Sequence, residues 1–215
     1  MKPISISTKL SDEQIMEAVR QIKVAYKLKR TLRYASDRDL TVHNESVAEH
    51  VFALLFLAEY FLPFEDPDDK LDVQKLYRIL LFHDFGEITH GDIPYHLKTK
   101  VDEEREQADA EEVFASLPPS LREIGHESWR AYTEKDGREA RFAYALDKIE
   151  PLFELFDPIN ERSLKRTHHT YQDHIERKRK ATEGFPVMQK FVEVVSKDML
   201  ERDVFWKEDT SINSK

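Results

Sequence analysis

The sequence predicts an all-α fold on three observations. Only five glycines occur among 215 residues, so few positions favour sharp turns. The apolar residues recur mostly three or four positions apart, which is the spacing of one face of a helix. Three segments (11–14, 46–49 and 120–123) carry a helix-start pattern in which Ser is followed three residues later by Gln or Glu. We therefore expect helices joined by short loops around one core.

The first half of the chain contains three predicted helices. Their expected extents are about 11–30, 46–63 and 71–88. A polar loop, 35–44, separates the first two, Pro63 ends the second, and Gly91 closes the third. The apolar face of the second helix carries Val47, His50, Val51, Leu54, Ala58 and Phe61.

The second half contains four more predicted helices. They cover 102–116, a segment from 120, a segment after Gly137 with Asp147 and Pro151 inside it, and about 187–199. A polar and basic stretch lies before the last of them. We expect residues 1–158 to form the core and residues 159–215 to form a helical extension packed on the same domain.

Composition and charge narrow the function classes. The formal net charge is −9, which opposes general binding to polyanions, although a basic patch can still attract a small phosphorylated ligand. Because cysteine is absent, any bound metal must use imidazole and carboxylate groups. No apolar run reaches the roughly 18 residues of a membrane span, and the first residues lack a signal-peptide pattern. We expect a cytoplasmic protein with no membrane and no duplex nucleic acid as partner.

The segment 83–87, with the sequence HDFGE, directly follows the apolar run 79–82. On a helix Glu87 lies four residues from His83 and three from Asp84, so the three side chains can converge. Buried carboxylates need a partner, and a divalent cation satisfies two carboxylates and an imidazole together. The alternative is a helix end with solvated charges.

Two further residues add to this set. His50 interrupts an apolar helix face, where its ring nitrogens need partners, although a lone histidine there is more often a satisfied core residue. Asp147 lies in an apolar helix, and aspartate is rarely buried without a positive partner. Two imidazoles and two carboxylates suit a borderline divalent ion with positions left for water and substrate.

Three motifs in this order resemble one family. The segments 45–50 (ESVAEH), 83–87 (HDFGE) and 91–94 (GDIP), followed by the distant Asp147, are similar to the HD-domain phosphohydrolases, in the branch of the 5'-deoxynucleotidases. The resemblance covers about 28–157. It implies a helical HD-domain bundle, one divalent metal ion (Mn, Co, Mg, Zn or Fe), hydrolysis of deoxynucleoside 5'-monophosphates, and a homodimer.

The resemblance also implies roles for single residues. Glu87 and Asp92 become acid–base or water-positioning groups, and Arg33 becomes a phosphate contact. Tyr34 follows Arg33 where the family usually has a nearby Trp at the substrate wall. The implied metal ligands are His50, His83, Asp84 and Asp147.

Several alternatives stay open from the sequence. The same ligand set can serve a nucleoside triphosphohydrolase or a phosphodiesterase, since the pocket walls decide the substrate. A nucleotide-binding protein with a structural metal is a third possibility. His90 could bind a second metal, but Glu87 stands where the phosphodiesterase branch has lysine, so we expect one metal. Asp92 could simply cap the chain as it turns at Ile93-Pro94.

Overall fold

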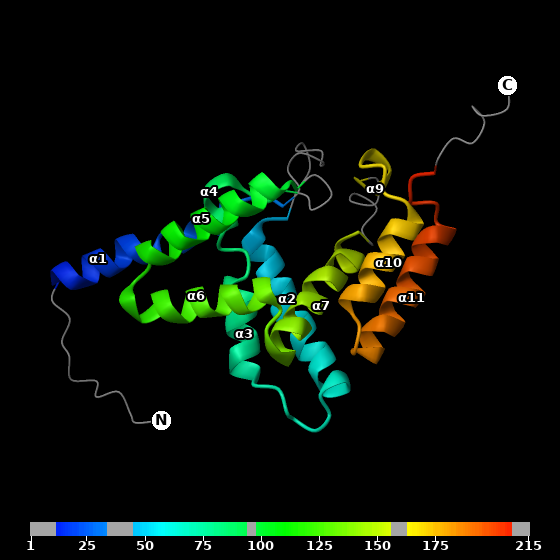
Figure 1. Ribbon diagram of the computed structural model, residues 1–215, viewed down its shortest axis with the longest axis horizontal. Helices are drawn as coiled ribbons and strands as arrows, with labels where there is room; N and C mark the ends of the chain where they lie inside the picture. Colours follow the sequence, from blue (N-terminus) through cyan, green and yellow to red (C-terminus); the bar gives the residue numbers. More distant parts are fainter. Residues whose placement is uncertain (1–11, 34–44, 94–97, 156–162, 208–215) are drawn as a thin grey trace.

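The computed structural model describes residues 12–33, 45–93, 98–155 and 163–207, and in these ranges every extended regular element is a helix (Figure 1). The all-α prediction is therefore confirmed. In chain order the elements are α1 (Asp12–Ile22), η1 (Ala25–Arg30), α2 (Val47–Glu65), α3 (Val73–Phe82), α4 (Glu87–His90), α5 (Lys100–Ser116), α6 (Pro119–Glu134), α7 (Gly137–Glu154), α9 (Ser163–Arg166), α10 (Tyr171–Ala181) and α11 (Pro186–Glu201). The predicted loop 35–44 lies outside the described residues.

Two apolar clusters hold these helices together. The larger joins α2, α3, α7 and α11, and its fully buried side chains include Leu54, Phe61, Ile79, Phe142 and Leu146. The smaller joins η1, α5 and α6, and it contains Leu28, Val47, Phe82, Phe85, Phe114 and Trp129. The chain passes from the first cluster to the second between Leu80 and Phe82. The His83-Asp84 pair therefore lies at the junction of the two clusters.

Helix α2 starts as the sequence predicts. The Ser46 hydroxyl accepts the backbone N–H of Glu49, and the Glu49 carboxylate accepts the Ser46 backbone N–H, so both arms of the capping box form. The predicted end was wrong, because Pro63 lies inside the helix and α2 continues to Glu65. Proline removes only one backbone donor, and a single further turn can be completed, with the Asp66 N–H bonding to Leu62 O.

The predicted third helix is interrupted. Helix α3 ends at Phe82, and tight turns in which Phe85 N–H bonds to Phe82 O and Glu87 N–H bonds to Asp84 O lead into the short α4. At this break the ring of His83 takes the Leu80 carbonyl as its hydrogen-bond acceptor. His83 and Asp84 are therefore displayed from a turn and not from the middle of a helix.

Helix α2 is also long and apolar enough to cross a membrane by length and composition alone, with 39% of its most apolar window buried. One of its sides packs on α3, α7 and α11, which accounts for the residues buried there. The opposite side exposes four aromatic side chains at four-residue spacing: Phe52, Phe56, Tyr60 and Phe64.

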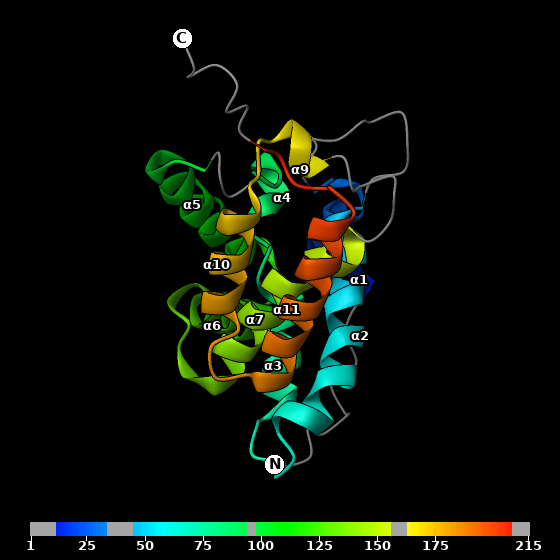
Figure 2. The same cartoon turned by 90° about the vertical axis from the view of Figure 1, so that its right-hand side faces the viewer.

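The chain beyond 162 packs against the core. Helices α10 and α11 lie side by side, and both contact α7 (Figure 2). Buried side chains from this part, including Ile175, Met188 and Val192, belong to the larger apolar cluster. Polar contacts join it to the core as well, since the backbone N–H of Met188 donates to the Glu65 carboxylate over 2.7 Å.

Candidate metal centre

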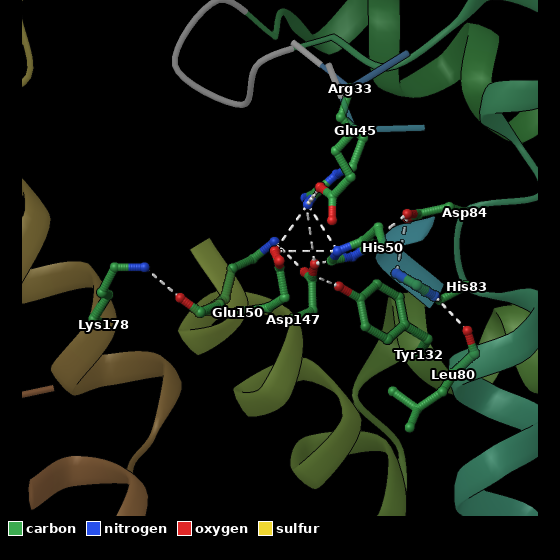
Figure 3. A network of polar contacts seen from close by, with 11 residues as sticks. Arg33, Glu45, His50, Leu80, His83, Asp84, Tyr132, Asp147, Glu150 and Lys178 are labelled. Atoms are coloured by element: carbon green, nitrogen blue, oxygen red, sulfur yellow. Dashed lines mark hydrogen bonds and ion pairs between the residues drawn. The ribbon is translucent and has the colours of Figure 1, made fainter. Parts of the chain in front are cut away.

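The structure brings the four predicted ligands together from three elements. His50 lies on the first turn of α2, His83 and Asp84 in the turn after α3, and Asp147 in the middle of α7 (Figure 3). One potential ligand atom from each of His50, His83 and Asp84 lies within 4.8 Å of the others. The Asp147 Oδ1 lies 3.2 Å from His50 Nε2.

His83 carries the feature that fits a metal best. Its Nδ1–H donates to the Leu80 carbonyl over 2.8 Å, which fixes the tautomer and leaves the lone pair on Nε2. That Nε2 atom is buried and has no hydrogen-bond partner among the described residues, although Asp84 Oδ2 lies 3.1 Å away. A buried ring nitrogen with a free lone pair beside a carboxylate is what a divalent ion requires.

His50 is fully buried between a cation and two carboxylates. Arg33 Nη1 lies 2.7 Å from its Nδ1, and Asp147 and Glu150 lie on opposite sides of the ring. Burial and Arg33 oppose a charge on His50, but hydrogen bonds to Asp147 and Glu150 outweigh them and raise its pKa to about 9. Binding of a metal at Nε2 therefore has to displace a proton.

Asp147 is held by two donors besides His50. The Tyr132 hydroxyl and the Lys148 ammonium each donate to its Oδ2 over 2.5 Å. Burial alone would raise the pKa of Asp147, but Lys148 and His50 keep it well below its usual value. The carboxylate is therefore ionised and ready to bind a cation. Tyr132 and Lys148 had no role in the sequence interpretation, and no pattern in the sequence singles them out.

A buried ion cluster lies beside the proposed ligands, and its central residue Arg33 also lines the cavity that they face. Arg33 Nη1 donates to Glu45 and to Glu150, each over 3.0 Å, and Arg33 is only 5% exposed. Burial and Glu150 raise the pKa of Glu45 to about 7 against the opposing effect of Arg33. The atoms of Glu45, His50 and Glu150 also satisfy the spacing of a metal site, but the guanidinium already lies among them. Glu150 could have been found from its position three residues after Asp147 on the same helix.

The remaining predicted residues are distributed as follows. Glu87 and Asp92 line the same cavity as Asp84 and Asp147, and Tyr34 lies outside the described residues. Burial, Asp84 and Asp92 raise the pKa of Glu87 well above its usual value, and its buried Oε2 has no hydrogen-bond partner in the part of the chain that the structure describes. His90 is half exposed and pairs with Asp109 of α5.

Position 86, inside the HDFGE segment, has no room for a side chain. A Cβ atom there would lie 2.9 Å from Glu106 Cγ and 3.1 Å from the Glu106 backbone oxygen. The absence of a side chain therefore lets α5 pass close to the turn that carries His83 and Asp84.

Three of the four metal-ligand candidates, His83, Asp84 and Asp147, line one large cavity of about 930 Å³, together with Glu87 and Asp92. The fourth, His50, lies behind them and is fully buried. The other walls carry aromatic side chains (Trp129, Tyr132 and Tyr144) and basic side chains (among them Lys148, Arg177 and Lys178).

Residues 25–189 match the HD domain as a protein family, and the chain therefore belongs to the HD-domain family. The match extends beyond 158, the expected end of the core. The chain is similar to the 5'-deoxynucleotidase HDDC2 of Homo sapiens, with 30% identity over 112 residues, which is 51% of this chain and 52% of the relative. The HDDC2 of Xenopus laevis is 28% identical over 138 residues, 63% of this chain and 66% of that protein. The chain spans about half the length of the first of these relatives.

Two solved structures share the fold. A predicted metal-dependent phosphohydrolase from Magnetospirillum magnetotacticum superimposes with a TM-score of 0.76 at 24% identity, covering 93% of this chain and all of that one. An HD-domain phosphohydrolase from Listeria innocua gives a TM-score of 0.54 at 21% identity, covering 86% and 97%. The fold of this protein is thus that of HD-domain phosphohydrolases.

We expect His83→Ala and Asp147→Ala each to remove tightly bound divalent metal, because each deletes a proposed ligand and leaves the backbone of its turn or helix intact. Elemental analysis of the purified proteins measures the metal content. His126→Ala is the matched control, since that histidine pairs with Glu111 and does not line the cavity. Full metal occupancy in either ligand variant would remove that residue from the centre.

Arg33→Met should destabilise the fold by about 3–5 kcal/mol at neutral pH, because it leaves Glu45 and Glu150 buried without their cation. Urea unfolding measures the loss. Arg179→Met is the control, since its exposed pair with Glu193 is worth only about 0–1 kcal/mol. If Arg33→Met unfolded at the parental urea concentration and only raised the Michaelis constant, Arg33 would be a phosphate contact rather than a structural cation.

Proposed function

We propose that this protein is a metal-dependent phosphohydrolase that converts deoxynucleoside 5'-monophosphates to deoxynucleoside and phosphate. The observation that carries the proposal is the buried Nε2 of His83, which accepts no hydrogen bond from the described residues and lies beside Asp84 at the wall of a cavity large enough for a nucleotide. The similarity to HDDC2, named a 5'-deoxynucleotidase, supports the choice of substrate.

The proposed ligands His50, His83, Asp84 and Asp147 would hold one divalent ion. When bound, such an ion lowers the pKa of a water molecule and offsets charge on the phosphoryl oxygens. Divalent Mn, Co, Mg, Zn and Fe ions are each compatible with a ligand set of two imidazoles and two carboxylates.

The protein's own residues would manage protons and position. The raised pKa of Glu87 keeps its carboxyl group able to donate a proton to the leaving 5'-oxygen. Asp92 lies on the same side of the cavity and contributes to that raised pKa. Tyr132 fixes the orientation of Asp147 through its hydrogen bond, and Trp129 and Tyr144 offer apolar surface to the base and sugar.

Phosphate release from deoxynucleoside mono-, di- and triphosphates with added Mn²⁺, Co²⁺ or Mg²⁺ tests the proposal. We expect inorganic phosphate from the 5'-monophosphates. A triphosphohydrolase would instead release tripolyphosphate from triphosphates, and a phosphodiesterase would cleave only diesters. A scaffold protein with a structural metal would hold its metal and release nothing, which would overturn the proposal.

Glu87→Gln should lower turnover by about 10²- to 10⁴-fold, the usual contribution of a positioned acid–base group, with metal content and Michaelis constant little changed. Glutamine keeps the shape and cannot donate the same proton. Steady-state kinetics with elemental analysis measure both quantities. Near-parental turnover in a variant that keeps its metal would move the role to Asp92.

We also propose that the protein forms a homodimer through the exposed side of α2. Phe52, Phe56, Tyr60 and Phe64 are 71%, 68%, 48% and 53% exposed, and they form a continuous ridge along one helix face. A ridge of this kind can pack against its own copy across a two-fold axis. Sedimentation of the parent protein and of Phe56→Ser would measure the association. The cytoplasmic location stays a prediction.

A further inference from the structure

The cavity has a basic wall on the side away from Glu87 and Asp92. Lys148 of α7 and Arg177, Lys178 and Lys180 of α10 line it. Among the described lining residues there are eight Lys or Arg and six Asp or Glu, whereas the whole chain has a net charge of −9. Positive charge is therefore concentrated in the cavity, even before a metal cation is added.

Lys178 is the best-placed residue of this wall. It is partly buried, extends from α10 toward the cluster around Asp147, and donates to the backbone carbonyl of Lys148 (Figure 3). The Lys148 ammonium in turn contacts the Asp147 carboxylate. Lys178 thus lies two contacts away from a proposed metal ligand.

No carboxylate in the described part of the chain lies within ion-pair distance of Lys178, and its hydrogen bond goes to a neutral carbonyl. Burial and Lys148 lower its pKa to about 7 against the opposing effect of the more distant Glu150 and Asp147, so holding this charge in the wall is costly. A buried cation without an anionic partner is expensive unless a ligand supplies one.

The size of the cavity leaves room for such a ligand. Its volume of about 930 Å³ lies near the upper end of the roughly 300–1,000 Å³ seen for ligand sites. A nucleotide can therefore place one phosphate at the proposed metal ligands and reach the basic wall with another group.

We propose that Lys148, Arg177 and Lys178 bind a second phosphate group of the substrate, so that the preferred substrate is a nucleotide with two phosphates. The inference rests on the proposed function and specifies its substrate. A deoxynucleoside 5'-monophosphate is then the smallest substrate that the site accepts, and a nucleotide with a second phosphate is the preferred one. The hydrolysis is unchanged: the water oxygen bonds to phosphorus, the bond from phosphorus to the leaving oxygen breaks, and that oxygen takes a proton.

The experiment compares kcat/KM for deoxyadenosine 5'-monophosphate, 3',5'-bisphosphate and 5'-diphosphate in the metal-loaded parent, Lys178→Met and Lys178→Arg. The two larger substrates show whether the second phosphate lies on the sugar or on the first phosphate. The parent should prefer one of them by about tenfold or more, as expected for a charged hydrogen bond. Lys178→Met should lose that preference through a higher KM, and Lys178→Arg should restore most of it.

Lys197→Met is the matched control. It removes the same charge, but this exposed lysine of α11 does not line the cavity. It should leave every ratio unchanged. A parent without preference, or a Lys178→Met protein that keeps it, would overturn the inference. If none of the three substrates is hydrolysed, the proposed function fails. Calorimetric binding of deoxyadenosine 3',5'-bisphosphate and 5'-diphosphate by the parent and by Lys178→Met then tests the basic wall alone, and equal affinities of the two proteins would overturn the inference.

Discussion

The guanidinium of Arg33 is the interaction on which the rest of the site depends. It joins Glu45, which precedes α2, to Glu150 on α7, two residues 105 positions apart in the chain. Backbone hydrogen bonds from Arg33 N–H to Glu45 O and from Val47 N–H to Thr31 O set the position of this arginine. The same guanidinium touches His50, so the fold of the first segment and the placement of a proposed ligand are determined together.

Such a cluster constrains the fold more than it stabilises it. Burying Arg33 and two carboxylates costs solvation that the ion pairs only partly return, and a missing partner leaves an uncompensated charge. His50 and Asp147 share this environment: the hydrogen bond between them requires α2 and α7 to approach in one register. The two helices therefore pack in the arrangement that keeps these buried groups paired.

Much of this could be predicted from the sequence, because its signals are local. The capping box at Ser46 and the apolar face of α2 depend on residues within a few positions of each other, and both formed as predicted. The prediction of a continuous helix over 71–88 was wrong. At the break the ring of His83 donates a hydrogen bond to the Leu80 backbone carbonyl, and the spacing of apolar residues carries no information about such a bond. Glu150 follows Asp147 at helical spacing, but its pairing with Arg33 and that of Glu45 join segments far apart in the chain, which no local pattern reveals.

The C-terminal extension shows why charge patterns resist interpretation from sequence alone. From the sequence alone, the basic residues of α10 are expected to form a solvated helix face. For Arg179 this is correct, since it pairs with Glu193 at the surface. The neighbouring Lys178 points about 100° away around the helix, toward α7, and reaches the cavity. Two adjacent residues of α10 therefore differ in role: Arg179 forms a surface ion pair, and Lys178 is a cation close to the proposed metal centre. Because α7 carries Asp147 and also supports α10, the core and the extension contribute opposite walls of one cavity.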